Sequence, residues 1–264
     1  MWHKEAPIDL LAYDETRQLA KQEIQIRDGR SLMLKLLCWW LLREWRYLKS
    51  WRWQEGTTWY FAFGANLDAK VLKTRHMRPM AIVPFVLKDY ELRFDHPSSW
   101  QGVGYASAHA AQGRQIYGHL IQLPDCDASR MDCDELVPFF RRYVRHEHEQ
   151  EGHQFYFYVS NVPTNNLLPT PRYLGMMLSG LRLNPHIPAN MLSHYQNHET
   201  RLPETPTPDS EYFVQRGRWP NWLRKIAGPY EIAMSRLLIT RVRHWTIFGH
   251  FMKINSYYKN LGIE

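Results

Sequence analysis

The sequence predicts an α/β protein of the α+β type, in which a strand-rich middle lies between two helical flanks. From residue 58 to about residue 160, apolar residues alternate with polar ones or form short runs, as is typical of strands. Stretches on either side are long enough for helices. A polar segment rich in proline, Thr200–Ser210, predicts a linker. We therefore expect three regions: residues 1–57, 58–198 and 199–264.

Two helices are predicted in the first region. One runs from Asp14, an acceptable N-cap, to Asp28, with Gly29 as its stop. The other runs from Ser31 to about Trp53 and mixes tryptophans with Lys and Arg. Such a helix either packs its aromatic face on the middle region while the cations stay in water, lies at a membrane surface, or contacts nucleic acid. We expect no nucleic acid, and membrane contact stays open.

The middle region predicts strands first and helices later. Strands are expected at Ala81–Leu87, Tyr90–Phe94, Val103–Ala110 and Gln115–Leu123, the last two joined by a hairpin turn at Gln112-Gly113. A short helix or turn is expected from Asp127 to about Leu136. A second hairpin joins Tyr143–Glu149 to Phe155–Val159 through Glu151-Gly152. Helices are expected at Arg172–Leu181 and Ala189–Asn197, and in the tail at Ile226–Leu238 and Thr240–Tyr258.

Composition excludes some classes of protein. The net charge of +7 comes from the flanks, because residues 58–199 hold thirteen Lys and Arg against thirteen Asp and Glu. Three cysteines predict a reducing, cytoplasmic compartment without a disulfide framework. We expect neither a signal peptide nor a membrane span, since the longest apolar run, Leu36–Leu42, is far shorter than the ~20 residues that a span needs. Phosphate-binding, dinucleotide-binding and zinc motifs are missing from the sequence, so we expect no cofactor and no metal.

The most informative stretch is residues 60–67, Tyr-Phe-Ala-Phe-Gly-Ala-Asn-Leu. It begins as a buried strand and breaks at Gly64, after which Asn66 and Asp68 are placed to cap a helix. A strand that turns into a helix start presents several backbone N–H groups at one point and can bind an anion. An ordinary strand–helix turn without a ligand is the alternative.

Three blocks of residues 58–198 together resemble the γ-glutamylcyclotransferase family. The stretch 60–67 is similar to the family's Y-F-A-Y-G-S/A-N loop. Gly104-Tyr105-Ala106 and residues 113–120 are similar to two of its strands, and residues 131–135, Met-Asp-Cys-Asp-Glu, to its L-D-x-x-E motif. Residues 169–174, Pro-Thr-Pro-Arg-Tyr-Leu, followed by Gly180, Pro188 and Leu192, are similar to its P-S-x-x-Y segment. The resemblance implies a small mixed sheet or partial barrel, with the active site at the barrel mouth.

The resemblance also implies a reaction, in which the α-amine of a γ-glutamyl substrate attacks its own γ-carbonyl. This releases 5-oxoproline and a free amine, which makes the protein an enzyme of the lyase or acyltransferase type. Glu135 would be the general acid and base, and the apolar residues after it would raise its proton affinity. The implied substrate-binding residues are Tyr60, Phe61, Ala62, Phe63, Gly64, Ala65, Asn66, Tyr143 and Tyr173.

Three departures from the family pattern put the substrate in doubt. Phe63 stands where the family has a loop tyrosine, Ala65 where it often has serine, and Leu136 where a glycine often follows the catalytic glutamate. The glutathione-specific branch has a different loop, so glutathione is not the expected substrate. The sequence leaves open the leaving amine, the oligomeric state and the role of the flanks. It also leaves two alternatives: a binding module without catalysis, and a related amide-bond transferase or hydrolase that uses Glu135.

Overall fold

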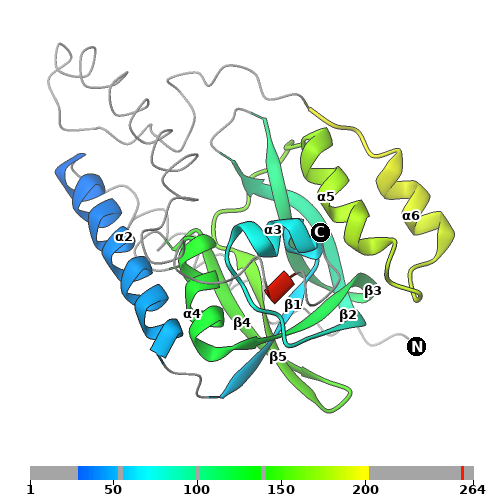
Figure 1. Cartoon of the computed structure of the whole chain (residues 1–264). Coiled ribbons are helices and arrows are strands. Elements are labelled where there is room, and N and C mark those ends of the chain that lie inside the picture. Colours follow the sequence, from blue (N-terminus) through cyan, green and yellow to red (C-terminus); the bar gives the residue numbers. More distant parts are fainter. Residues whose placement is uncertain (1–28, 53–55, 99–101, 138–140, 202–256, 259–264) are drawn as a thin grey trace, which may run out of the picture.

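The computed structural model describes residues 29–52, 56–98, 102–137, 141–201 and 257–258. A five-stranded sheet with strand order β2-β3-β1-β5-β4 forms its centre (Figure 1). The predicted helix at 14–28, most of the linker and most of the tail lie outside the described residues. The division of the chain into three regions therefore stays a prediction.

Strand β1 (Thr57–Ala62) lies in the middle of the sheet and pairs differently on its two sides. It runs antiparallel to β3 (Gly104–Pro124) and parallel to β5 (His153–Ser160). Strand β2 (Ala81–Pro97) pairs with β3, and β4 (Tyr143–Gln150) pairs with β5, both antiparallel. The sheet is therefore mixed, and together with the helices it confirms the predicted α+β class.

The predicted hairpin turn at Gln112-Gly113 is wrong, because β3 continues through these residues. Strand β2 is likewise continuous where two strands are predicted. The registers Lys88↔Gln115 and Tyr90↔Ala110 leave four residues of β3 opposite Asp89 alone. Both Gly113 and Asp89 have a positive φ, and the Gly113 N–H donates to the Asp89 carboxylate at 2.7 Å. The polar Gln-Gly pair thus marks an irregularity within a long two-stranded ribbon.

Side chains join the two edges of the open sheet. The Gln150 amide of β4 accepts from the Lys88 backbone N–H at 2.9 Å and donates to the Val86 carbonyl at 2.8 Å. Tyr90 and His146 form a further contact across the same gap at 3.0 Å. The sheet curls without closing through backbone ladders, which gives the predicted partial barrel its form. The second predicted hairpin is confirmed, and its turn residues Glu151 and Gly152 both have positive φ.

Helices lie on two sides of the sheet (Figure 1). A 3-10 turn η1 (Ala65–Leu67) and α3 (Ala69–Thr74) follow β1, and the Asp68 carboxylate caps α3 by accepting from the Lys70 N–H at 2.8 Å. Helix α4 (Asp125–Asp134) follows β3. Helices α5 (Pro171–Leu181) and α6 (Ala189–Gln196) pack together, and α5 lies against η1. The chain approaches closely there, since a Cβ on Gly180 would lie 2.4 Å from the Leu67 carbonyl oxygen.

The tryptophan-rich helix α2 (Gly29–Arg52) packs on α4. Trp39 is buried and its indole N–H donates to the Cys133 carbonyl at 2.8 Å. Arg43 is also buried and forms an ion pair with Asp134 at 3.4 Å. Arg46 donates to the Ser129 carbonyl. Packing of this helix on the middle region, one of the predicted alternatives, is thus confirmed for these residues.

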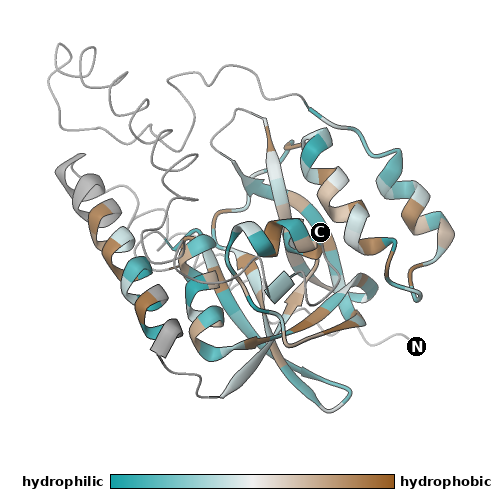
Figure 2. Cartoon of the chain, in the orientation of Figure 1, coloured by the Kyte–Doolittle hydropathy of each residue, from teal (hydrophilic) through white to brown (hydrophobic). Residues whose placement is uncertain are grey.

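Apolar residues recur along α2 (Figure 2), and some of them are exposed. Leu37, Leu41 and Trp45 recur every four residues and are each more than half exposed. Helices of the described residues are all too short or too polar to cross a membrane. Membrane-surface contact through α2 therefore stays a prediction.

The core lies between the concave sheet and the helices. It is rich in aromatic residues, and β1 and β5 contribute several rings, among them Phe61, Phe155 and Phe157. Tyr258 of the C-terminal segment belongs to this core, with no exposed surface, and its hydroxyl donates to the Met77 carbonyl at 2.8 Å. The adjacent Tyr257 donates to the Pro79 carbonyl at 2.5 Å. The end of the described chain is therefore anchored on the segment that follows α3.

Candidate active site

The turn after β1 places several predicted site residues together. Gly64 leads into η1, where the Leu67 and Asp68 N–H groups donate to the carbonyls of Gly64 and Ala65 at 3.1 Å. These two N–H groups serve the turn itself. The side chain of Asn66 is buried and directed toward the end of α4. The predicted loop thus brings a side-chain amide, as well as backbone, to the site.

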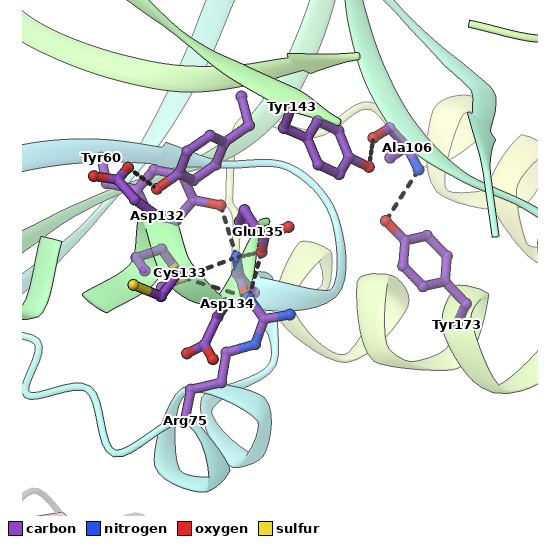
Figure 3. A network of polar contacts seen from close by, with 12 residues as sticks. Tyr60, Arg75, Ala106, Asp132, Cys133, Asp134, Glu135, Tyr143 and Tyr173 are labelled. Carbon is purple, nitrogen blue, oxygen red and sulfur yellow. Dashed lines mark hydrogen bonds and ion pairs between the residues drawn. The ribbon is translucent and has the colours of Figure 1, made fainter. Parts of the chain in front are cut away.

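Glu135 lies at the C-terminal end of α4, directly beside this turn (Figure 3). Its Oε1 accepts from the Asn66 amide Nδ2 at 3.2 Å and from a guanidinium N–H of Arg75. The carboxylate side chain is only 14% exposed and that of Arg75 only 12%. The immediate partners of Glu135 are therefore polar. Phe139 and Phe140, part of the predicted apolar surroundings, lie outside the described residues.

Backbone geometry at the end of α4 fixes the position of Glu135. The Leu136 N–H donates to the Cys133 carbonyl at 3.1 Å and the Val137 N–H to the Asp132 carbonyl at 2.9 Å, a helix end typical of a glycine at its left-handed position. Here that position is Leu136, with φ 57°. The residue that departs from the family pattern thus adopts the conformation that favours glycine.

Asp132 ties the same helix to the sheet. Its Oδ1 accepts from Arg145 Nε at 2.7 Å and from the Tyr158 hydroxyl at 2.8 Å. The Arg145 guanidinium also lies 3.8 Å from the centre of the Tyr156 ring. Contacts from α2 and from β4 and β5 therefore hold the helix that ends at Glu135 from two sides.

Charges in this region are coupled. Burial lowers the pKa of the Arg75 guanidinium, but Glu135 and then Asp134 raise it, and the net shift is upward. Burial and the Glu135 carboxylate both raise the pKa of Tyr60 well above its usual value, although the Asn66 hydrogen bond opposes them. Tyr60 Oη accepts from Asn66 Nδ2 at 2.8 Å. Arg75 therefore stays charged, and Tyr60 keeps its proton at neutral pH.

Tyr143 and Tyr173 both bind the backbone of one residue of β3, Ala106 (Figure 3). The Ala106 N–H donates to the Tyr173 hydroxyl, and the Tyr143 hydroxyl donates to the Ala106 carbonyl, each at 3.1 Å. A Cβ on Gly64 would lie 2.7 Å from the Tyr173 hydroxyl, so this tyrosine lies directly against the turn. Burial is the main cause that raises the pKa of both phenols.

The other predicted site residues contribute differently. Phe61 and Ala62 are fully buried, and Phe63 nearly so, among the rings of the core. Only their backbone is available to a ligand. The loss of a tyrosine hydroxyl at Phe63 therefore occurs at a ring that packs on Phe61 and Phe157.

Sequence reasoning missed Arg75, which pairs with Glu135 across 60 residues of chain. It stands at the end of the short helix after the turn, one position past α3. No local motif marked Arg75, because its pairing with Glu135 forms only when the segment after the turn packs against the end of α4.

No protein-family model matches the chain, and no curated protein matches it. Solved structures similar to it include "Gamma-glutamyl cyclotransferase", at 20% identity over 65% of this chain and 98% of the other, with a TM-score of 0.45. An uncharacterized protein from Homo sapiens is 21% identical over the same shares, with a TM-score of 0.46. YkqA from Bacillus subtilis is 19% identical over 60% of each chain, with a TM-score of 0.45. We therefore base the functional proposal on the residues of this chain.

Proposed function

We propose that this protein is a γ-glutamylcyclotransferase-like enzyme that cleaves a γ-glutamyl amide and releases 5-oxoproline and a free amine. One observation carries the proposal: a nearly buried carboxylate, Glu135, is held by Asn66 and Arg75 beside the turn after β1. This is the residue and the turn that the sequence motifs single out. Burial in a site of fixed dipoles is what a proton-transfer group needs.

The reaction requires bond making and proton transfer within one substrate. Glu135 takes a proton from the α-ammonium, and the resulting amine attacks the γ-carbonyl carbon to form the ring N–C bond. The protonated carboxyl then donates to the departing nitrogen as the old C–N bond breaks. The ring nitrogen still carries an extra proton after the attack and gives it to Glu135, which passes it to the released amine, so that the amine leaves as an ammonium. Both protons lost by the α-nitrogen end on the leaving amine, and no water is consumed. Because the attack is intramolecular, holding the reactive rotamer supplies much of the acceleration.

The polar partners of Glu135 fit the first of these steps. A guanidinium and an amide N–H favour the charged form of a carboxylate. Glu135 is therefore suited to accept the first proton from the α-ammonium. Its later role as an acid follows once it holds the substrate proton next to the departing amine.

Hydrogen bonds fix the tyrosine rings that surround the proposed site. Tyr143 and Tyr173 are fixed by the backbone of Ala106, and Tyr60 is fixed by Asn66. Aromatic rings held in this way can restrict the γ-glutamyl chain to few rotamers. The turn from Gly64 to Asn66 would face the substrate's head group and the oxyanion that develops on the γ-carbonyl.

The test is release of 5-oxoproline, followed by mass spectrometry, from a panel of γ-glutamyl amides whose leaving groups are amino acids, polyamines and other amines. We expect wild-type protein to release it from at least one member. Glu135→Gln keeps the size of the side chain but removes the base, and the rate should fall by about 100-fold or more.

Glu149→Gln is the matched control, because Glu149 is exposed on β4 and lies outside the site. It should retain the wild-type rate. An unchanged rate in Glu135→Gln would contradict the role of this residue. Binding of 5-oxoproline without turnover of any panel member would favour the binding module instead. Release of glutamate would favour a hydrolase.

A further inference from the structure

The amide of Asn66 leaves one buried acceptor without a donor. Its Nδ2 donates to both Tyr60 and Glu135, so the amide orientation is fixed. The opposite atom, Oδ1, has no hydrogen-bond partner among the described residues, although the side chain is only 5% exposed. A buried acceptor without a partner is unfavourable, because it has lost its hydrogen bonds to water. A ligand that brings an N–H donor would satisfy this acceptor, and an α-ammonium is such a donor.

A buried cation, Arg75, contacts the same carboxylate oxygen as Asn66. The Arg75 guanidinium reaches Glu135 Oε1 and lies 3.4 Å from Met131 Sδ. A guanidinium has five N–H groups and can bind more than one carboxylate at a time. Next to it, Asp134 is already paired with Arg43 of α2. Asp134, the second anion near Arg75, is thus neutralised by an arginine of α2.

The pair Glu135–Arg75 is complementary to a zwitterion. An α-amino acid head group brings one ammonium and one carboxylate, so binding converts one internal ion pair into two pairs with the substrate. No charge is left buried without a partner. A substrate with the amine alone would draw Glu135 away from Arg75 and supply no carboxylate in its place, so the buried guanidinium would lose an ion pair, which is costly.

We propose that Arg75 binds the α-carboxylate of the substrate, while Asn66 Oδ1 and Glu135 receive its α-ammonium. This deepens the proposed function and rests on it: ring closure itself requires the amine and the γ-carbonyl but no α-carboxylate. Arg75 then determines specificity by restricting the enzyme to γ-glutamyl compounds whose α-carboxylate is free. When the substrate carboxylate binds Arg75, the ion pair between Arg75 and Glu135 weakens. Glu135 can then accept the proton of the α-ammonium.

The decisive experiment compares a γ-glutamyl amide with the 4-aminobutanoyl amide of the same amine. The second compound lacks only the α-carboxylate and closes to 2-pyrrolidinone through the same bonds. Wild type should prefer the γ-glutamyl amide by about 100-fold or more in kcat/KM. In Arg75→Met the γ-glutamyl rate should fall while the preference collapses to about fivefold or less. Arg75→Lys, which keeps the charge, should restore part of the preference.

A purely structural role for Arg75 gives a different result. If Arg75 only holds Glu135, both substrates lose rate by the same factor in Arg75→Met and the preference is unchanged, which overturns the proposal. Circular dichroism and thermal unfolding show whether the variant folds. Arg93→Met, which removes an exposed arginine of β2 paired with Glu91, is the control for loss of charge.

A binding measurement keeps this test independent of the proposed reaction. Calorimetric titration compares 5-oxoproline, which carries the carboxylate, with 2-pyrrolidinone, which lacks it. Tighter binding of 5-oxoproline to wild type, lost in Arg75→Met, supports the carboxylate site even if every amide proves inert. Equal binding of both compounds to wild type contradicts it. Inert amides with a functioning carboxylate site would refute the reaction alone.

Discussion

At the scale of single residues, Tyr143 and Tyr173 are both hydrogen-bonded to the backbone of the same residue, Ala106. The Ala106 N–H and carbonyl bind Tyr173 and Tyr143 respectively. A hydroxyl that is already bonded to buried backbone contributes to ligand binding mainly through its ring and its fixed position. We therefore expect these tyrosines to shape the site, while Glu135, Asn66 and Arg75 supply its polar groups.

Leu136 gives a prediction about local strain. At φ 57° a side chain crowds the backbone, whereas glycine adopts this conformation without penalty. Leu136→Gly should therefore be more stable than Leu136→Ala by about 1 kcal/mol in urea unfolding. Both variants lose the leucine side chain, so their difference isolates the backbone conformation. If Leu136→Ala were the more stable variant, the backbone at the end of α4 would have left the left-handed conformation, which would contradict the prediction.

Motifs could predict part of the site but not all of it. Glu135 and Asn66 stand in short stretches whose residue types indicate their surroundings, and the structure brings the two within hydrogen-bond distance. Arg75 belongs to no such stretch. Its pairing with Glu135 depends on how η1 and α3 fold back onto α4, a tertiary arrangement that local spacing does not encode.

At the scale of elements, α2 supports the helix that ends at Glu135. Trp39 donates to the carbonyl of Cys133 in the last turn of α4, and Arg46 donates to Ser129 in the turn before it. Carbonyls near a helix C-terminus attract donors and cations, because they carry the negative end of the helix dipole. The N-terminal flank therefore completes the scaffold of the candidate site.

Arg43→Met tests this support. The Arg43–Asp134 pair is nearly fully buried, and loss of one member leaves the other with reduced compensation. We expect the free energy of unfolding to fall by about 3 kcal/mol. Lys49→Met on the same helix removes an exposed cation that lies over Trp45, and should change stability by less than about 0.5 kcal/mol. Equal effects of the two substitutions would refute a supporting role for the inner face.

The outer face of α2 carries a separate prediction, membrane-surface contact. Leu37, Leu41 and Trp45 form an exposed apolar row beside Lys49, an arrangement that suits an anionic lipid surface. We expect the full chain to sediment with anionic vesicles at low salt, and less so as salt rises. Trp45→Glu should weaken this binding. Failure to sediment at low salt would dismiss the idea.

The prediction of hairpin turns succeeded where the turn joins two neighbouring strands, and failed where the residues instead contact a distant part of the sheet. Glu151-Gly152 joins two strands that pair with each other, so its residue types sufficed. Gln112-Gly113 has a similar composition but faces Asp89 across the sheet. These two residues stay within β3 because β3 pairs with the whole of β2. A short window of sequence cannot reveal that pairing.

At the scale of the whole molecule, both flanks contact the middle region near the Arg75–Glu135 pair. Helix α2 holds α4, and Tyr257 and Tyr258 hold residues 77–79, just after Arg75. The sequence predicted helical flanks with an aromatic and basic character, but their docking depends on surfaces that exist only after folding. Whether the two flanks also pack on each other, as one hypothesis holds, concerns residues outside the described ranges.

The central claim is that the γ-glutamyl bond is broken by the substrate's own amine and not by water. Turnover of a γ-glutamyl amide in H₂¹⁸O tests it most directly, with mass spectrometry of both products. The account predicts 5-oxoproline without ¹⁸O, formed in equal amount to the released amine by wild type and lost in Glu135→Gln. Glutamate that carries ¹⁸O would contradict the account, since it would show that Glu135 or a neighbouring group activates water.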